Sequence, residues 1–218
     1  TWDNSLGLDA VLHEDDYLAT SDNTKLPALK SFRKTEKKLA KVSNSKAAKK
    51  KGSKARRNLA KREGRIHQKI ARARLDHAYK TSHALVRTGK KVFFCEDLNL
   101  KGLSKRNKAK QDDKGNYLPN GQKAKSGLNK SWTDAGFGQF FSTLEYIAEK
   151  AGARVIKVKP AYTSQLLSYR DEFIFTDCGI REYWDKKELL NIDRDINASI
   201  KCDSFGRNLY LRGMTSFC

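Results

Sequence analysis

The sequence lacks any run of about 18 consecutive apolar residues, the shortest stretch that crosses a bilayer as a helix. It also opens without an apolar signal segment, so nothing in it predicts export. A membrane protein is therefore excluded, and we expect an intracellular protein with no membrane partner.

Cysteine is scarce and scattered. The 218 residues contain four cysteines, and none of them has CxxC spacing: Cys95, Cys178, Cys202 and Cys218. This distribution suits a reducing compartment better than a disulfide framework. We expect no zinc site built by this chain alone.

Acidic residues are too few to balance the basic ones. The chain has 25 Asp and Glu against 45 Lys and Arg, which gives a formal net charge of +20. This excess is larger than solubility requires and is typical of proteins that hold polyphosphate backbones. Nucleic acid is therefore the expected partner, and the length fits one domain with a small insert.

The basic residues are most dense between positions 33 and 74. Apolar residues recur there at helical spacing, which predicts two helices joined at Gly52, the second with one face on the domain and another facing phosphate. The alternative is a solvated charged helix, but few acids other than Glu63 and Asp76 are present to pair with the cations. The candidate nucleic-acid-binding residues are Lys49, Lys50, Lys51, Lys54, Arg56, Arg57, Lys61, Arg62, Arg65, Lys69 and Arg72.

Acidic residues stand at the boundaries of apolar segments in three distant places. In VFFCEDLNL, an apolar run predicts a buried strand that ends at Glu96. Asp9 lies in SLGLDAVL, the first strand of a predicted hairpin, and Asp193 and Asp195 begin a predicted helix in NIDRDINAS. We expect the three segments to converge on one divalent-metal site. The alternatives are a turn or capping role for Asp9 and helix capping for the late acids.

The polar stretch 101–130 is glycine-rich and basic without an apolar period, which predicts a mobile loop. A strong apolar stripe then predicts a core helix that begins at Ser131 or Thr133 and ends at Gly152. Asp134 would lie in the first turn of that helix, where it either favours the helix dipole or lies near the metal site.

After a predicted strand over 154–159, several polar side chains follow closely. Thr163, Ser164 and Gln165 either bond phosphate or stabilise a turn. Residues 166–190 contain aromatic residues and are expected to form a small hairpin insert.

The expected order of elements is three strands, a helical segment, a strand ending in a carboxylate, a helix, a strand and a final helix with carboxylates. This α/β order is that of the ribonuclease H-like (RuvC) fold, a mixed sheet flanked by helices. Several segments in this order resemble the RuvC nuclease region of the TnpB (OrfB) family, transposon-encoded RNA-guided nucleases akin to type V CRISPR effectors. The segments are LATSDN, FRKTEKKLAK, KKKGSKARRNLAKREGRIHQKIARARLDHAYK, FFCEDLNLKGL, KSWTDAGFGQFFSTLEYIAEKAGARVIKV, AYTSQ and DRDINASI.

The resemblance implies a metal-dependent, RNA-guided DNA endonuclease in the cytoplasm of a prokaryote. Asp9 matches the first catalytic acid, Glu96 the second and Asp195 the third, with Asp193 as a neighbouring metal ligand. The implied cofactor is Mg²⁺ or Mn²⁺, because hard carboxylate oxygens suit these ions and paired ions can cleave a phosphodiester. DNA and a guide RNA are the implied partners, and base pairing with the guide would read the target sequence.

The resemblance also implies an organisation into domains. The family closes a zinc ribbon with two cysteine pairs, of which this chain keeps only Cys178. We therefore expect a degenerate, metal-free zinc-ribbon-like insert held by its aromatic residues. The expected parts are a RuvC-like core over 1–160 that contains the basic helical segment 33–89 and the loop 101–130, the insert 161–191, a final core helix 192–202 and an unassigned tail 203–218.

Two departures from the family concern the start of the chain. Val11 stands where the family has a glycine, which leaves Asp15 and Asp16 as alternatives to Asp9 for the first ligand. Eight residues precede Asp9, whereas the family carries large segments there, so we expect a fragment of a longer nuclease or a decayed copy. The alternative functions are an inactive nucleic-acid-binding remnant and another ribonuclease H-like enzyme, such as a junction resolvase or a DDE-type transposase.

Overall fold

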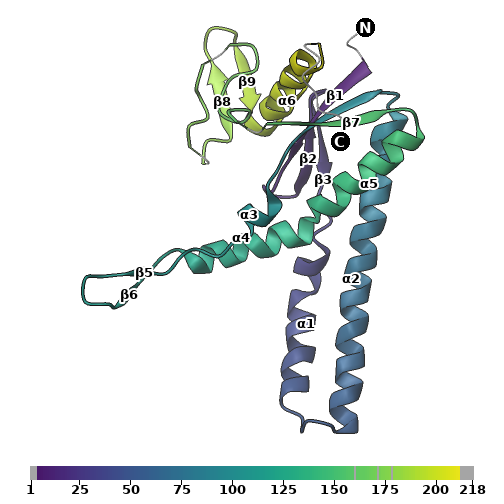
Figure 1. The fold of residues 1–218 in the computed structure, drawn as a ribbon, viewed down its shortest axis with the longest axis vertical. Coiled ribbons are helices and arrows are strands. Elements are labelled where there is room, and N and C mark those ends of the chain that lie inside the picture. Colours follow the sequence, from purple (N-terminus) through teal and green to yellow (C-terminus); the bar gives the residue numbers. More distant parts are fainter. Residues whose placement is uncertain (1–3, 160, 171, 178, 212–218) are drawn as a thin grey trace.

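A mixed sheet lies at the centre of the computed structural model, which describes residues 4–159, 161–170, 172–177 and 179–211 (Figure 1). Among these residues the sheet has five strands in the order β3-β2-β1-β4-β7. β2 is antiparallel to both β3 and β1, while β4 is parallel to β1 and β7 is parallel to β4. The mixed α/β prediction is therefore confirmed. The strands are β1 (Ser5–Ala10), β2 (Asp16–Thr20), β3 (Thr24–Pro27), β4 (Val92–Glu96) and β7 (Arg154–Val158).

Helices cover both faces of this sheet. One face packs against α2 (Lys54–Arg87) and α5 (Phe137–Lys150), and the other against α6 (Arg194–Leu211). Successive side chains of a strand point to opposite faces, and accordingly Phe93 joins the core on the α2 and α5 side while Phe94 packs with Cys202 of α6. Because β1 and β4 are buried on both faces, their sequences are apolar almost throughout.

Two glycines allow α6 to lie close against the sheet. A Cβ on Gly7 of β1 would stand 2.0 Å from the carbonyl oxygen of Ser199, and a Cβ on Gly206 of α6 would stand 2.0 Å from the ring of Phe94. Neither position therefore accepts a side chain without moving the helix. The close packing fixes the first turn of α6 beside the end of β1.

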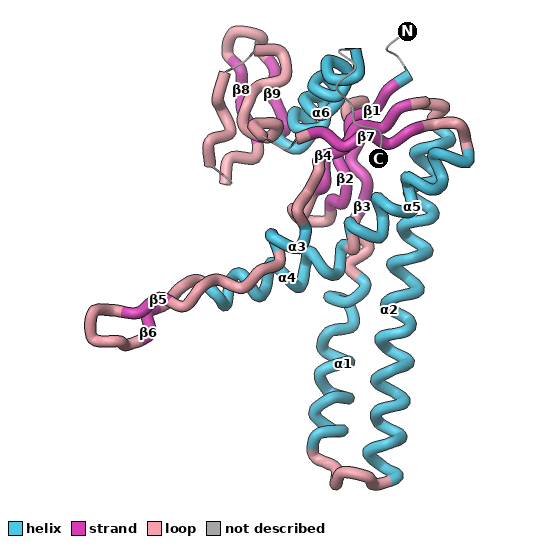
Figure 2. Tube along the Cα trace, viewed as in Figure 1, coloured by secondary structure: helices cyan, strands magenta, loops and turns pink. Residues whose placement is uncertain are grey.

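A long helical hairpin projects from the sheet and consists of α1 (Ser31–Ala47) and α2 (Figures 1 and 2). The turn between them contains Gly52, whose φ is +81°, and Ser53 then caps α2 by accepting a hydrogen bond of 3.2 Å from the main-chain N–H of Arg56. The predicted pair of helices joined at Gly52 is confirmed.

The stretch 101–130 is more ordered than its composition predicts. It contains most of α3 (Leu100–Leu103), a two-stranded hairpin of β5 (Lys110–Gln111) and β6 (Tyr117–Leu118), and the start of α4 (Gln122–Ala135). The expectation of a loop up to 130 was wrong because polar contacts hold this part of α4. Lys125 and Asn129 donate to the carbonyl oxygens of Leu103 and Ser104, at 2.6 and 2.8 Å.

A break at Gly136 separates α4 from α5. This glycine has a φ of +66° and stands at the end of one helix and the start of the next. The sequence predicted Asp134 in the first turn of a helix. The structure places it in the last turn of α4 instead. Its buried carboxylate accepts hydrogen bonds from the N–H groups of Phe32 and Arg33, at 2.7 and 2.9 Å, and so caps the start of α1.

The chain after β7 forms the predicted hairpin insert, with β8 (Glu182–Asp185) antiparallel to β9 (Leu190–Asp193). The final helix continues to Leu211, so ending it at 202 was wrong. The sequence beyond 202 shows little apolar pattern, because this part of α6 meets the sheet partly through a glycine and an acid. Gly206 packs on the ring of Phe94, and Asp203 accepts a hydrogen bond from the Ser5 hydroxyl. Cys178 and residues 212–218 lie outside the described part.

Within the described ranges, no helix has both the length and the apolar character that a membrane span requires.

Candidate metal centre and nucleic-acid interface

Three acids that are distant in the sequence lie in one neighbourhood. Asp9 is near the end of β1 and Glu96 ends β4; these strands are adjacent and parallel, with Leu8 opposite Cys95. Asp195 lies in the first turn of α6. Burial raises the pKa of Asp9 well above its usual range, and the negative charges of Glu96 and Asp195 raise it further. The structure thus brings the predicted first, second and third acids together.

Glu96 is held by the insert. Burial raises the pKa of Glu96, while a hydrogen bond from the Thr163 hydroxyl and the positive charge of Arg194 act against that rise. Thr163 is 0 % exposed, so the expectation that it contacts phosphate was wrong, and it belongs with the carboxylates.

Gln165 takes part in a turn. Its main-chain N–H donates to the carbonyl oxygen of Tyr162 at 3.2 Å, and its own carbonyl oxygen accepts from Ile174 at 3.0 Å. The turn alternative therefore describes Gln165. Ser164, between Thr163 and Gln165 in the sequence, is half-buried.

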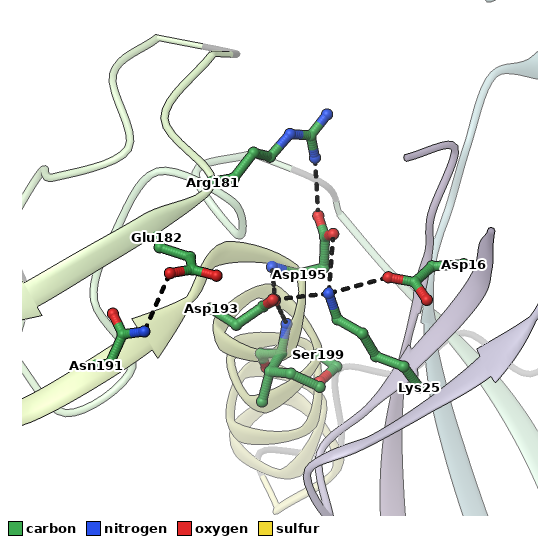
Figure 3. Close-up of polar contacts among 9 residues, drawn as sticks. Asp16, Lys25, Arg181, Glu182, Asn191, Asp193, Asp195 and Ser199 are labelled. Carbon is green, nitrogen blue, oxygen red and sulfur yellow. Dashed lines mark hydrogen bonds and ion pairs between the residues drawn. The ribbon is translucent and has the colours of Figure 1, made fainter. Parts of the chain in front are cut away.

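The late acids are surrounded by cations (Figure 3). The Nζ atom of Lys25, on β3, lies 2.7 Å from Oδ2 of Asp193 and 3.7 Å from Oδ2 of Asp195. Arg181, which precedes β8, donates from Nη1 to Oδ1 of Asp195 at 3.2 Å. Asp193 also accepts the main-chain N–H groups of Asp195 and Ile196, at 2.9 and 3.1 Å, so the capping role predicted as an alternative is present.

The two fallback acids differ in position. Asp15 has an 89 % exposed side chain that pairs with Lys30 at 2.8 Å, away from the other acids. Asp16 pairs with Lys25 at 3.1 Å and lies across the Lys25 ammonium group from Asp193 (Figure 3). Asp9, by contrast, is buried, and the negative charges of both Glu96 and Asp195 raise its pKa, so it is the best placed of the three to serve as a first ligand.

The carboxylates do not form a closed ligand set. Among the described residues, no three or more His, Cys, Asp and Glu side chains are placed to hold a metal ion. Asp195 instead accepts a hydrogen bond from Arg181, and Glu96 accepts one from Thr163. The donor chemistry nevertheless fits Mg²⁺ or Mn²⁺, because all donors are hard oxygens and crowded buried acids gain from a divalent cation between them.

A second surface is built from the predicted basic residues. Arg56 is an exception, since it is half-buried and donates to the carbonyl oxygens of Lys46 and Lys49, both at 3.1 Å, which closes the turn between α1 and α2. The other ten are exposed: Lys49, Lys50, Lys51, Lys54, Arg57, Lys61, Arg62, Arg65, Lys69 and Arg72.

Six of these cations form one line along α2. They recur every three or four residues, which is one face of a helix, and at 1.5 Å per residue the line is about 27 Å long. We call this line the basic stripe: Lys54, Arg57, Lys61, Arg65, Lys69 and Arg72.

The sequence predicted that aromatic residues hold the insert, and they do so only in part. Trp184 and Phe173 are 53 % and 55 % exposed, although Phe175 is buried. In addition, the buried carboxylate of Asp185 accepts a hydrogen bond from the Tyr169 hydroxyl. Arg170 pairs with the same carboxylate at 2.8 Å. A polar network therefore stabilises the insert.

Sequence reasoning missed Lys25, Arg181 and Arg194 as residues of the acidic site. Arg194 stands between two candidate ligands in DRDIN, and this position was a usable signal. Lys25 and Arg181 reach acids from other elements, and no local pattern predicts such contacts.

The sequence matches two known protein families and one curated relative. Residues 3–107 match the OrfB_IS605 family, described as "Probable transposase", and residues 137–202 match the family "Cas12f1-like, TNB domain". The chain is 33% identical over 165 residues to the Escherichia coli (strain K12) protein "Putative RNA-guided DNA endonuclease InsQ". That match covers 75% of this chain and 39% of the relative.

Two solved structures share the fold. One is the "Cryo-EM structure of the Cas12f1-sgRNA-target DNA complex", with a TM-score of 0.57, 14% identity, and coverage of 91% of this chain and 49% of that chain. The other is the "Cryo-EM structure of CRISPR-Cas12f Ternary Complex", with a TM-score of 0.59, 15% identity, and coverage of 91% and 38%. This chain spans less than half the length of each of the three relatives. By its two family matches and its curated relative, the chain belongs to the TnpB (OrfB) family of transposon-encoded proteins.

Proposed function

We propose that this chain is the nuclease region of an RNA-guided DNA endonuclease of transposon origin, with a RuvC-like fold and a requirement for Mg²⁺ or Mn²⁺. The observation that carries the proposal is the convergence of Asp9, Glu96 and Asp195 from three elements, close enough for each charge to act on Asp9. Buried like charges are costly, and they are typical of sites that act on a bound cation or a proton.

Each residue of the acidic site has a proposed role. Asp9, Glu96 and Asp195, with Asp193 beside them, would hold the metal. Bound ions would supply an activated water and stabilise the leaving oxygen. Thr163 orients the carboxylate of Glu96, and the positive charge of Arg194 offsets part of the repulsion between Asp9 and Glu96.

DNA and a guide RNA are the proposed partners, and pairing with the guide would read sequence. The basic stripe would hold phosphates, which makes binding depend strongly on salt. An exposed aromatic pair lies next to the acidic site, because Tyr162 precedes Thr163 and its ring packs edge-on against Phe173 with centroids 5.6 Å apart. This pair would stack on bases of a single strand.

The proposed domain organisation follows the elements of the structure. The core would comprise residues 1–160 together with α6, and the core includes the helical hairpin and the β5–β6 extension. Residues 161–191 would be a zinc-ribbon-like insert whose polar network around Asp185 takes the structural place of a metal.

A second candidate is a nucleic-acid-binding remnant without activity. It is favoured by the ion pairs of Asp195 with Lys25 and Arg181, which satisfy the third acid without a metal. This candidate predicts salt-sensitive binding and no cleavage.

Cleavage assays on the protein purified with its bound RNA test the proposal. We expect cutting of single-stranded DNA in Mg²⁺, loss of cutting in EDTA, and loss of cutting in the Glu96→Gln variant. Glu145→Gln is the matched control, since Glu145 is partly exposed and pairs with Lys157 at 3.0 Å. Cutting that survives Glu96→Gln would overturn the proposal, and a wild-type protein that binds DNA in a salt-sensitive way without cutting it would favour the remnant.

A further inference from the structure

Lys25 joins three carboxylates that come from three different elements. Its Nζ atom lies 2.7 Å from Asp193 at the end of β9, 3.1 Å from Asp16 at the start of β2, and 3.7 Å from Asp195 in α6 (Figure 3). The Lys25 side chain is 26% exposed and that of Asp195 is 10% exposed, so water screens these charges only in part.

The oxygens of the late acids are all engaged by nitrogen donors. Oδ1 of Asp195 accepts from Arg181, and its Oδ2 faces Lys25. Oδ1 of Asp193 accepts the N–H groups of the first turn of α6, and its Oδ2 accepts from Lys25 at 2.7 Å. A metal ion that binds Asp195 therefore competes with two cations that already face its two oxygens.

Lys25 and Arg181 approach the carboxylate of Asp195 from opposite sides (Figure 3). Lys25 belongs to the sheet, whereas Arg181 belongs to the insert, where its carbonyl oxygen accepts the N–H of Arg194 at 2.9 Å. This main-chain contact ties the segment carrying Arg181 to the start of α6. The insert thus closes one side of the third acid.

We propose that Lys25 and Arg181 are resident cations of the third acid, and that a divalent ion completes the site only by displacing them from Asp195. The proposal rests on the proposed metal-dependent function. Lys25 keeps its shorter contacts with Asp16 and Asp193 when it gives up Asp195, so a small movement is enough. Release of Arg181 requires a movement of its side chain or of the insert.

The competition gives a direct expectation for metal affinity. A partly exposed pair of opposite charges contributes up to about 1 kcal/mol. Removing the competing cation should make the free energy of metal binding more favourable by this amount. Lys25→Gln and Arg181→Gln should each bind Mn²⁺ about threefold to fivefold more tightly than the wild type does. Lys30→Gln is the matched control, because it removes the same charge from a lysine that pairs with Asp15 at 2.8 Å and not with Asp195.

Mn²⁺ binding is measured by electron paramagnetic resonance on the whole chain without nucleic acid, and thermal melting with and without Mg²⁺ supplies a second readout. Lys25→Gln should melt at a lower temperature without Mg²⁺, because three carboxylates then repel one another, and it should gain more from Mg²⁺ than the wild type does. A merely structural Lys25 would leave the Mn²⁺ affinity of the variant unchanged or weaker.

The outcomes separate this proposal from the proposed function. Equal Mn²⁺ affinity in the wild type, Lys25→Gln and Arg181→Gln overturns the competition, and so does an equal gain in Lys30→Gln. Tighter Mn²⁺ binding in both test variants supports it, even if neither variant nor the wild type cuts DNA. If Lys25→Gln fails to fold, Arg181→Gln decides the question alone, since its side chain is more exposed.

Discussion

The hydroxyl of Thr163 donates a hydrogen bond to Oε1 of Glu96 and so joins the start of the insert to the end of β4. Thr163 is fully buried, and Glu96 is the acid that stands beside Asp9. The bond stabilises the charged form of Glu96 against the effect of burial. The insert therefore contributes to the acidic site as well as being attached to it.

Thr163→Val should weaken cleavage while leaving the packing nearly intact, because valine has a similar shape. A hydrogen bond to a charged group is worth about 1.5–3 kcal/mol, so we expect about a tenfold or greater loss in the cleavage rate at neutral pH. Loss of the bond also raises the pKa of Glu96, so activity should disappear at a higher pH as the solution is acidified.

A pH–rate profile of the Thr163→Val variant against the wild type measures both effects. Thr143→Val is the control, because Thr143 is also buried and its hydroxyl donates to the carbonyl oxygen of Gln139 in its own helix, at 2.8 Å. Equal profiles for the two variants would show that Thr163 has no special role.

The parts of the site that the sequence predicted share a physical basis. β1 and β4 are mostly apolar because both of their faces are buried, and so the acids near their ends stand out. Asp195 follows a good N-cap residue, Asp193, and this local pattern marks the start of a helix. The family resemblance then assigned roles to these positions.

The parts of the fold and the site that the sequence did not predict depend on contacts between polar groups that are distant in the sequence. The first half of α4 is held by Lys125 and Asn129, which bond carbonyl oxygens of α3 and its end, and no apolar period reveals such a helix. Lys25 contacts Asp193, which is 168 positions away in the sequence, and no local pattern of residues predicts so distant a contact. Thr163 looked like a phosphate ligand because a hydroxyl serves equally well as a carboxylate partner.

Gly7→Ala should destabilise the protein severely. The new Cβ would stand 2.0 Å from the carbonyl oxygen of Ser199 and 2.8 Å from the N atom of Asp203, both in the backbone of α6, so the helix has to move away. We expect a loss of about 3 kcal/mol in the free energy of unfolding, at the upper end of overpacking costs.

Gly64→Ala is the opposite case and the control for Gly7→Ala. Gly64 lies inside α2, and a Cβ there meets no atom within 4 Å. Alanine should raise the free energy of unfolding by about 0.5–1 kcal/mol, because it favours the helix. Urea denaturation of both variants measures the two changes, and a neutral Gly7→Ala would contradict the tight seating of α6.

Asp134→Ala should loosen the helical hairpin from α4. The buried carboxylate caps α1 through Phe32 and Arg33 and pairs with Arg74 of α2 at 3.4 Å, so its loss leaves N–H donors and a cation without it. Breaking a buried charged contact costs about 3–5 kcal/mol.

Asp76→Ala is the control, since Asp76 is exposed and pairs with Lys80 within α2, and it should change stability by less than about 0.5 kcal/mol. Urea denaturation followed by helical circular dichroism compares the two, and equal losses would remove the capping role.

The basic stripe should contact phosphates one by one, and its effect should appear in the salt dependence of binding. In the triple variant Lys61→Gln, Arg65→Gln and Lys69→Gln, the slope of log affinity against log salt for single-stranded DNA should become shallower by about 2, since each phosphate contact contributes about 0.7. A control triple variant removes the same charge from exposed lysines that pair with carboxylates elsewhere: Lys80, Lys130 and Lys157. Fluorescence anisotropy at several salt concentrations measures both slopes. If only the net charge of the protein attracts DNA, the two slopes change equally. A local contact surface predicts that the slope changes in the stripe variant alone, because the stripe cations follow one exposed face of α2 and the three control lysines already pair with carboxylates.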